Sequence, residues 1–206
     1  MIDFHYTTEE NGVRLQLKTD MTEVGTFHRM VTVLYALDWN IVSGEVRTSE
    51  KDGKTFADNT LLLSDEDGKK KTKVIEIGIL MDTVFSAKAS LEEILHEYTI
   101  PKVDPKKFFG KDFELIFFDE PKAGMTCFHI EAYSAKGLLY HVTKALADEK
   151  INIVSGLIET DEKTGKANDT FYLLDSQNRM FASDSVTERI RQRIWNTSRE
   201  YVKRQT

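Results

Sequence analysis

Cysteine is nearly absent from this chain of 206 residues, and the shortage excludes two ways of stabilising a fold. Cys127 stands alone, so neither an intramolecular disulfide nor a zinc site built from several thiolates can form. It lies in an apolar, strand-like pattern, which predicts a buried and unreactive thiol. Apolar runs of the ~20 residues that cross a bilayer are missing, and no basic leader with an apolar core follows Met1. We therefore expect a cytoplasmic protein.

Basic charge and catalytic motifs are scarce as well. The 34 acidic and 28 basic residues give a net charge of −6, which argues against a general nucleic-acid binder. The five histidines show no metal-binding spacing, and Gly53-Lys54-Thr55 lacks both the first glycine and the strand–helix setting of a phosphate loop. No pair of carboxylates indicates general acid–base catalysis. We expect no catalytic activity, no bound metal and no cofactor.

What the sequence does contain is a repeat with an offset of 112 residues. Gly25 recurs as Gly137, and the run Asn-Ile-Val-Ser-Gly at 40–44 recurs unchanged at 152–156. With 40 % apolar and 30 % charged residues, each copy has an ordinary globular composition and is long enough to bury a core. The repeat predicts two similar domains. We place them at 1–98 and 112–206, with a linker at 99–111.

Each copy predicts the same order of elements: strand, strand, helix, strand, strand, helix. Alternating apolar and polar residues predict an opening hairpin in each copy, with turns at 10–12 and 121–124. Apolar residues at three-to-four spacing predict a helix after Gly25 and another after Gly137. Two further strands then follow, at 41–48 and 59–63 in the first copy and at 153–160 and 170–174 in the second.

The helices that close the two copies differ in pattern. In the second copy, Ser185 and Glu188 form the pattern of a capping box at the start of a final helix. In the first copy, the segment 73–87 is apolar on more than one side, which is typical of a helix buried on two faces, and we expect it between the domains. A strand at 74–80 is the alternative. A short helix with its own capping box is predicted at 90–97.

Two helices over a four-stranded antiparallel sheet make the ferredoxin-like sandwich, so the predicted fold class is α+β with two such sandwiches. The usual order of that fold is βαββαβ. Here each copy opens with an extra hairpin strand and the second copy ends on its helix. The N-terminal hairpin strand can take the place of the last strand, because that strand pairs antiparallel with the first.

A helix that begins at Gly137-Leu138-Leu139-Tyr140 and a later strand with Asp169-Thr170-Phe171-Tyr172 mark the second copy. In these segments the chain resembles tandem ACT domains. It is similar to the C-terminal ACT repeats of bacterial uridylyltransferase/uridylyl-removing enzymes and to plant ACT-repeat proteins. The resemblance covers most of the second copy and extends more weakly to the first. Where the family has an acidic residue and a proline before the helix, this chain has Ser134 and Lys136 in the second copy.

The resemblance implies that a small ligand, typically an amino acid, lies between the loop before the first helix and a neighbouring domain's strand edge. Glycine there lets the backbone approach a ligand, and the unpaired N–H groups of the helix attract a carboxylate. Asn40 and Asn152 open the next strands and could bond the ligand's polar end. The alternative is that the glycines only make tight turns and the asparagines cap their own helices. The candidate ligand-binding residues are Glu23, Val24, Gly25, Thr26, Asn40, Ile41, Ser134, Lys136, Gly137, Leu138, Asn152 and Ile153.

Two functions fit these observations. The first is a non-catalytic regulatory sensor, in which an amino acid or similar metabolite changes the contact with a partner protein or a second copy. The second is an ACT-type oligomerisation or interaction module without a ligand site. Neither involves nucleic acid or a membrane. Because ACT domains often pair sheet edge to sheet edge, the two copies could form one eight-stranded sheet within the chain or pair between chains.

Overall fold

The computed structural model describes residues 2–65, 73–98, 109, 113–182 and 184–203, which form eight strands and five helices. The strands are β1 (Ile2–Glu9), β2 (Gly12–Thr19), β3 (Asn40–Lys51), β4 (Lys54–Ser64), β5 (Glu114–Glu120), β6 (Met125–Tyr133), β7 (Asn152–Asp161) and β8 (Lys166–Leu174). The helices are α1 (Thr26–Ala36), α2 (Val74–Phe85), α3 (Leu91–Glu97), α4 (Leu138–Asp148) and α5 (Asp184–Lys203). The predicted linker lies outside these residues apart from Phe109, which is buried.

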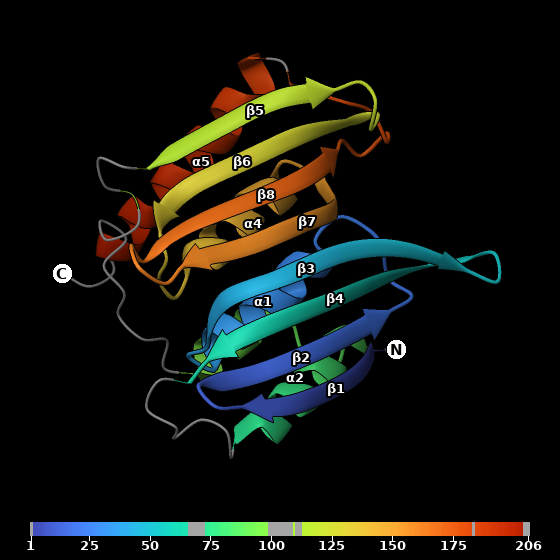
Figure 1. Ribbon diagram of the computed structural model, residues 1–206, viewed down its shortest axis with the longest axis vertical. Helices are drawn as coiled ribbons and strands as arrows, with labels where there is room; N and C mark the ends of the chain where they lie inside the picture. Colours follow the sequence, from blue (N-terminus) through green and yellow to red (C-terminus); the bar gives the residue numbers. More distant parts are fainter. Residues whose placement is uncertain (1, 66–72, 99–108, 110–112, 183, 204–206) are drawn as a thin grey trace.

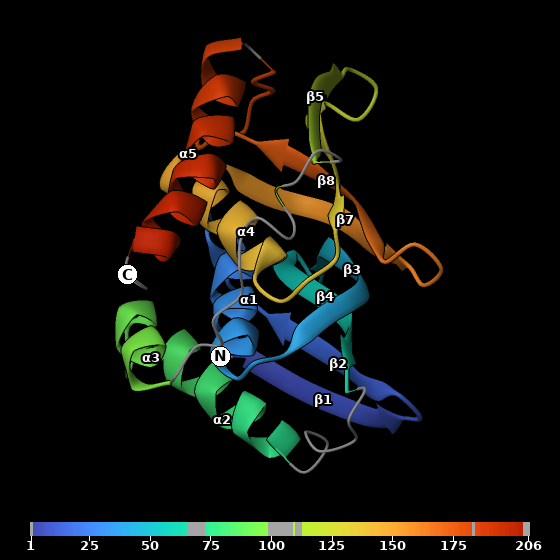
Figure 2. The same cartoon turned by 90° about the vertical axis from the view of Figure 1, so that its left-hand side faces the viewer.

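All eight strands belong to one antiparallel sheet in the order β1-β2-β4-β3-β7-β8-β6-β5 (Figure 1). The helices lie together on one face of the sheet and the other face is open (Figure 2). Within each half the hairpin strand lies outermost, beside the strand that precedes the first helix. This is the strand order predicted for a ferredoxin-like sandwich whose last strand is replaced by the hairpin strand. The mixed α+β fold class is therefore confirmed.

The core lies between the sheet and its helices. Alternate residues of the inner strands face it, and the largest of them are fully buried, among them Leu15, Leu61, Phe128 and Phe171. Burial of these apolar side chains is the main source of stability in a sandwich of this kind. Cys127 is also buried, as the sequence predicted, and burial raises the pKa of its thiol.

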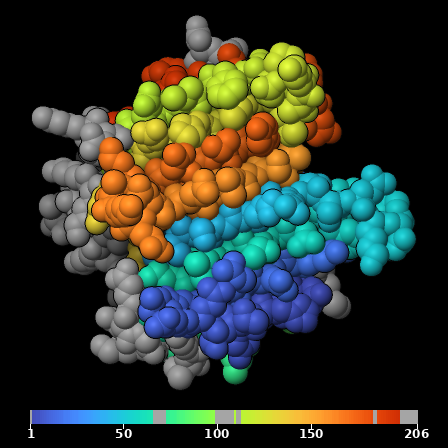
Figure 3. Space-filling view, viewed as in Figure 1, coloured from blue at the N-terminus to red at the C-terminus, as the bar shows by residue number. Residues whose placement is uncertain are grey.

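The two halves meet where β3 pairs with β7, which makes one continuous sheet within the chain. The register pairs Glu45 with Leu157, and these two residues are separated by the repeat offset of 112. Above the sheet, His28 of α1 and Tyr140 of α4 are also equivalent, and their ring centroids are 5.6 Å apart. Equivalent residues that contact each other lie on a local twofold axis. Figure 3 shows β3 and β7 meeting along the middle of the open face.

The repeated run Asn-Ile-Val-Ser-Gly builds this junction. It begins β3 and β7, and each strand has a register shift in it, between Ile41 and Ser43 and between Ile153 and Ser155. The glycine that ends each run lies against its sheet neighbour: a Cβ at Gly44 would lie 2.6 Å from the carbonyl oxygen of Thr60. The identity of the two runs thus follows from a shared β-bulge and from close packing of each glycine against the neighbouring strand of its own half.

The segment predicted as a helix at 73–87 forms α2, but the prediction that it lies between the domains is wrong. It packs against α1 and β1 at the outer edge of the molecule (Figure 2). Its outward side chains Ile75 and Ile79 are 63 % and 61 % exposed. The reason is topological: the helices that connect β2 to β3 and β6 to β7 cross the inner strands, so α1 and α4 occupy the junction.

The two predicted capping boxes differ in outcome. At α3, Ser90 accepts a hydrogen bond from the backbone N–H of Glu93, and the Glu93 side chain accepts one from the backbone of Ser90. The prediction at Ser185 is wrong, because α5 begins at Asp184 and places Ser185 inside the helix. A capping residue precedes the first helical residue.

Candidate functional site

The first helix of each half begins at a glycine with left-handed backbone. Gly25 has φ 87° and Gly137 has φ 91°, and no side chain caps either helix. Side chains other than glycine rarely adopt such angles. The surroundings differ, however: a Cβ at Gly137 would lie 2.9 Å from Cε2 of Tyr35, whereas at Gly25 the nearest atom would be 3.9 Å away. The left-handed backbone favours glycine at both positions, but only at 137 does a neighbouring side chain also leave no room for a Cβ.

The predicted site residues come together crosswise over the junction. Ser134, Gly137 and Leu138 of the second half line a cavity with Asn40 and Ile41 of the first half, and its volume is about 20 Å³. The equivalent cavity beside Gly25 is lined by Asn152 and Ile153 and measures about 10 Å³. Each is at most large enough for one water molecule. The loop of one half therefore does face the strand start of the other half.

A larger groove opens next to the first of these cavities, where the strands end at the left of Figure 1. Its volume is about 710 Å³, within the range of small-molecule sites. The groove and the cavity share Asn40, Ser134 and Thr160 in their linings. The Ser134 and Thr160 hydroxyls are 3.0 Å apart and share a hydrogen bond. The groove also receives the β1–β2 turn, so it draws its lining from both halves.

The remaining predicted residues mostly make protein contacts. Lys136 forms an ion pair of 2.7 Å with Asp38 of the other half. Glu23 is exposed and pairs with Arg29 at 3.0 Å, and neither Glu23 nor its half-buried neighbour Val24 lines the two cavities or the groove. The hydroxyl of Thr26 is buried without a hydrogen-bond partner among the described residues.

Asn152 lines the cavity beside Gly25 and also makes a contact across the junction that the sequence did not predict. Its side-chain amide donates a hydrogen bond of 3.2 Å to the backbone carbonyl of Thr22, in the loop of the other half. It therefore holds the two halves together and does not cap its own helix. Its equivalent Asn40 lines both the inner cavity and the groove.

Asp169 was not among the predicted residues, yet it lines the inner cavity and is 1 % exposed. Burial raises the pKa of Asp169 to about 7. A hydrogen bond from the Glu159 backbone N–H opposes this shift, and the negative charge of Glu159 adds to it. One carboxylate oxygen, Oδ1, accepts that bond at 3.2 Å, and no described residue donates to the other. The sequence did contain a signal. Ala167, Phe171 and Leu173 alternate along the strand as core-facing apolar residues, and Asp169 stands at the one position between them where another apolar residue would be expected.

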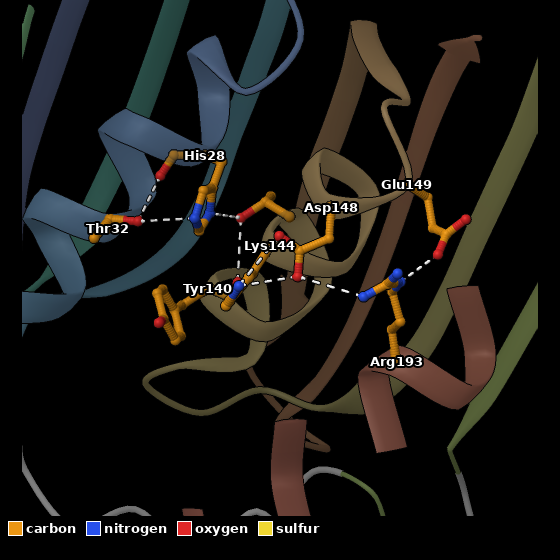
Figure 4. A network of polar contacts seen from close by, with 8 residues as sticks. His28, Thr32, Tyr140, Lys144, Asp148, Glu149 and Arg193 are labelled. Carbon is orange, nitrogen blue, oxygen red and sulfur yellow. Dashed lines mark hydrogen bonds and ion pairs between the residues drawn. The ribbon is translucent and has the colours of Figure 1, made fainter. Parts of the chain in front are cut away.

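Two histidines lie at the contact of α1 and α4, His141 buried and His28 half-buried. His28 shares a hydrogen bond of 3.0 Å with the hydroxyl of Thr143, and burial lowers its pKa to about 4. Burial, with the nearby Lys144 charge, also lowers the pKa of His141 to about 4. Figure 4 shows His28 reaching α4 and the ion pairs that continue to α5 through Lys144, Asp148, Arg193 and Glu149. The ring of His141 lies 6.4 Å from that of Tyr35 and 5.2 Å from that of Tyr140, so both histidines have structural roles in the junction.

The described residues contain neither a metal-binding cluster nor a membrane-spanning helix. No group of three or more His, Cys, Asp or Glu side chains in that part of the chain is arranged to hold a metal ion. None of the helices described there is both long and apolar enough to span a membrane.

Comparison with known proteins adds little. No protein-family profile matches the chain. Among solved structures, the chain is similar to an aspartate kinase from Synechocystis over 82 % of its own length, with 9 % sequence identity and a TM-score of 0.21. It spans 38 % of the length of that kinase. At this TM-score the likeness carries no argument about function, and the site must be argued from its own residues.

Proposed function

We propose that this chain is a non-catalytic regulatory protein whose two ACT-like halves bind a small metabolite, such as an amino acid, at their junction. The groove of about 710 Å³ supports the proposal, because it opens where the halves meet and includes Asn40 and Ser134 in its lining. A ligand there contacts both halves at once. Its binding free energy can therefore shift how they pack or how they contact a partner protein.

The groove supplies the room that the predicted sites lack. The cavities of about 20 and 10 Å³ are too small for an amino acid, whereas the groove lies within the usual 300–1,000 Å³ range of ligand sites. We therefore place the ligand in the groove, with one end directed to the inner cavity past Asn40, Ser134 and Thr160.

A thermal-shift screen against the twenty amino acids and common metabolites tests the proposal. A ligand at one hundred times its dissociation constant adds about 2.7 kcal/mol to the free energy of unfolding, which is a readily measured shift. The repeat supplies a matched pair of variants. Asn40→Ala should lose most of the shift, while Asn152→Ala should keep it and lower only the stability of the free protein, since its amide holds Thr22.

Calorimetric titration of the best compound would confirm the stoichiometry, with one ligand per chain expected. A folded protein that gives no shift with any compound contradicts the sensor proposal. Equal losses of binding in the two asparagine variants would place the ligand elsewhere.

A second candidate is an assembly module, which the exposed side chains Ile75 and Ile79 on α2 favour. Apolar side chains on one exposed helix face are typical of surfaces that contact another protein. Sedimentation of the wild type and of Ile79→Lys tests it. Self-association that the lysine abolishes, together with an empty ligand screen, would favour this function over the sensor.

A further inference from the structure

The inner cavity at the junction combines a buried carboxyl group with aromatic rings. Asp169 lines it together with Tyr35, Trp39 and Tyr140. Carboxylates and aromatic rings are the two groups that recognise ammonium ions in proteins, the first by charge and the second by cation–π attraction. The volume of about 20 Å³ accommodates one group the size of water, and an ammonium group has about that size.

The carboxyl group of Asp169 has capacity for such a ligand. Its side chain is 1 % exposed, and one of its oxygens receives no hydrogen bond from a described residue. An ammonium group in the cavity would donate a charge-assisted hydrogen bond to that oxygen. The hydroxyl of Thr160, which also lines the cavity, can accept a further hydrogen bond from an ammonium group.

The adjoining groove extends this chemistry outward. Its charged lining residues among the described part of the chain are all carboxylates: Glu9, Glu10 and Glu162. Glu9 forms an ion pair of 2.6 Å with Arg14, and Glu162 lies on the opposite side of the junction from it, so both halves contribute carboxylates to the mouth. Asn11, Asn40 and Ser43 add side-chain oxygens that can accept hydrogen bonds from a cation.

We propose that this site takes an organic diamine or polyamine, with one ammonium group in the inner cavity against Asp169 and a second in the groove near Glu162. The inference rests on the proposed function and names its ligand class. A chain of methylene groups between the two charges would lie along the half-buried apolar residues of the lining, Val42 and Leu62. An α-amino acid would place its carboxylate among carboxylates, which costs free energy.

The test uses the full chain and 1,4-diaminobutane, 1,5-diaminopentane and spermidine as probes in isothermal titration at pH 7.5. 1,4-Butanediol, glutamine, glutamate and CaCl₂ are the comparison compounds. We expect the amines to bind, the diol to give no heat, and Asp169→Asn to weaken amine binding by about tenfold or more, as for the loss of a charged hydrogen bond. Glu162→Gln should weaken it by a smaller factor, and Glu92→Gln, an exposed carboxylate on α3 with the same change of charge, should not affect it.

A second readout reports on Asp169 itself. Its carboxyl group is about half protonated near pH 7, and an ammonium ligand favours the charged form. Amine binding at pH 7 should therefore release about half a proton per ligand, measured by titration in buffers of different ionisation enthalpy. The release should disappear in Asp169→Asn. Should that variant fail to fold, Thr160→Val tests the same cavity and should also weaken binding.

The outcomes separate the two proposals. Binding of glutamine or glutamate without binding of the amines overturns the amine inference and leaves the sensor function in place. Calcium binding without amine binding also overturns the inference. No binding by any of these compounds overturns the amine inference, and the sensor proposal is overturned as well if the wider thermal-shift screen is also empty. Amine binding that is unchanged in both Asp169→Asn and Thr160→Val overturns the assigned site.

Discussion

Gly25 and Gly137 are equivalent in the repeat but differ in what surrounds them. Alanine at either position must hold a left-handed backbone, which costs roughly 1–2 kcal/mol. At 137 the new Cβ also meets Tyr35, whose ring is buried and stacked on Tyr140 at 4.5 Å and cannot move freely. We expect Gly137→Ala to lose about 1 kcal/mol or more beyond the loss in Gly25→Ala, by urea denaturation. Equal losses would show that the Tyr35 contact yields without cost.

Asp169 makes stability fall as the pH rises. Its pKa is about 7 in the fold against 3.8 for the ordinary side chain, so the folded state holds a proton that the unfolded state has lost. The stabilising contribution is complete below about pH 3.8 and is lost as the pH rises through about 7. Three pKa units correspond to an effect on the order of 4 kcal/mol. The free energy of unfolding of Asp169→Asn should therefore rise relative to that of the wild type as the pH increases from 5 to 8. Urea denaturation of both proteins at several pH values measures this difference. A constant difference across that range would contradict the raised pKa.

At the scale of elements, the contact of α1 with α4 should be sensitive to acid. Both His28 and His141 are held neutral in the fold, with pKa values of about 4 against 6.5. The unfolded chain takes up protons below pH 6.5, so stability is complete above that pH and decreases towards pH 4. The opposite contribution of Asp169 offsets part of this loss.

His28→Gln should reduce the loss of stability between pH 7.5 and pH 5 by on the order of 2 kcal/mol, since one of the two protonations is removed. His5→Gln, at a side chain that is 70 % exposed, is the control and should leave the loss as it is in the wild type. If the two variants behave alike, His28 is not responsible for the acid sensitivity.

The elements themselves were predictable, because apolar periodicity within one copy determines each strand and helix. Val13, Leu15 and Leu17 alternate, and all three are fully buried in β2. The position of α2 was not predictable, since a helix with apolar residues on two sides does not reveal whether its second face has a partner. The contact of Asn152 with Thr22 was not predictable for a similar reason: Thr22 is 130 residues away and becomes a neighbour only when the halves pair. The groove likewise exists only once the seam has formed.

At the scale of the whole molecule, the repeat predicts that the N-terminal half pairs more readily with the C-terminal half than with a copy of itself. The local twofold axis passes between Glu45 and Leu157, which face each other across the junction. Two N-terminal halves paired in the same way would therefore place Glu45 opposite Glu45. Like charges directly opposite in a sheet are destabilising, by a fraction of a kcal/mol up to about 1. A pair of C-terminal halves would instead bring two Leu157 side chains together. The covalent link adds to this preference by raising the effective concentration of the mixed pair.

Separate fragments 1–98 and 112–206, the domains proposed from the repeat, test this reasoning by sedimentation equilibrium. The C-terminal fragment should self-associate more tightly than the N-terminal fragment, and mixing the two should give a one-to-one complex. Leu157→Glu in the C-terminal fragment places glutamate opposite glutamate and should lower its self-association towards that of the N-terminal fragment. Tight dimers of the N-terminal fragment, or no effect of Leu157→Glu, would contradict the assigned axis. Fragments that fold only when mixed would show that the halves are not independent domains, because burial at the β3–β7 and α1–α4 contacts would then be needed to offset the conformational entropy of each half.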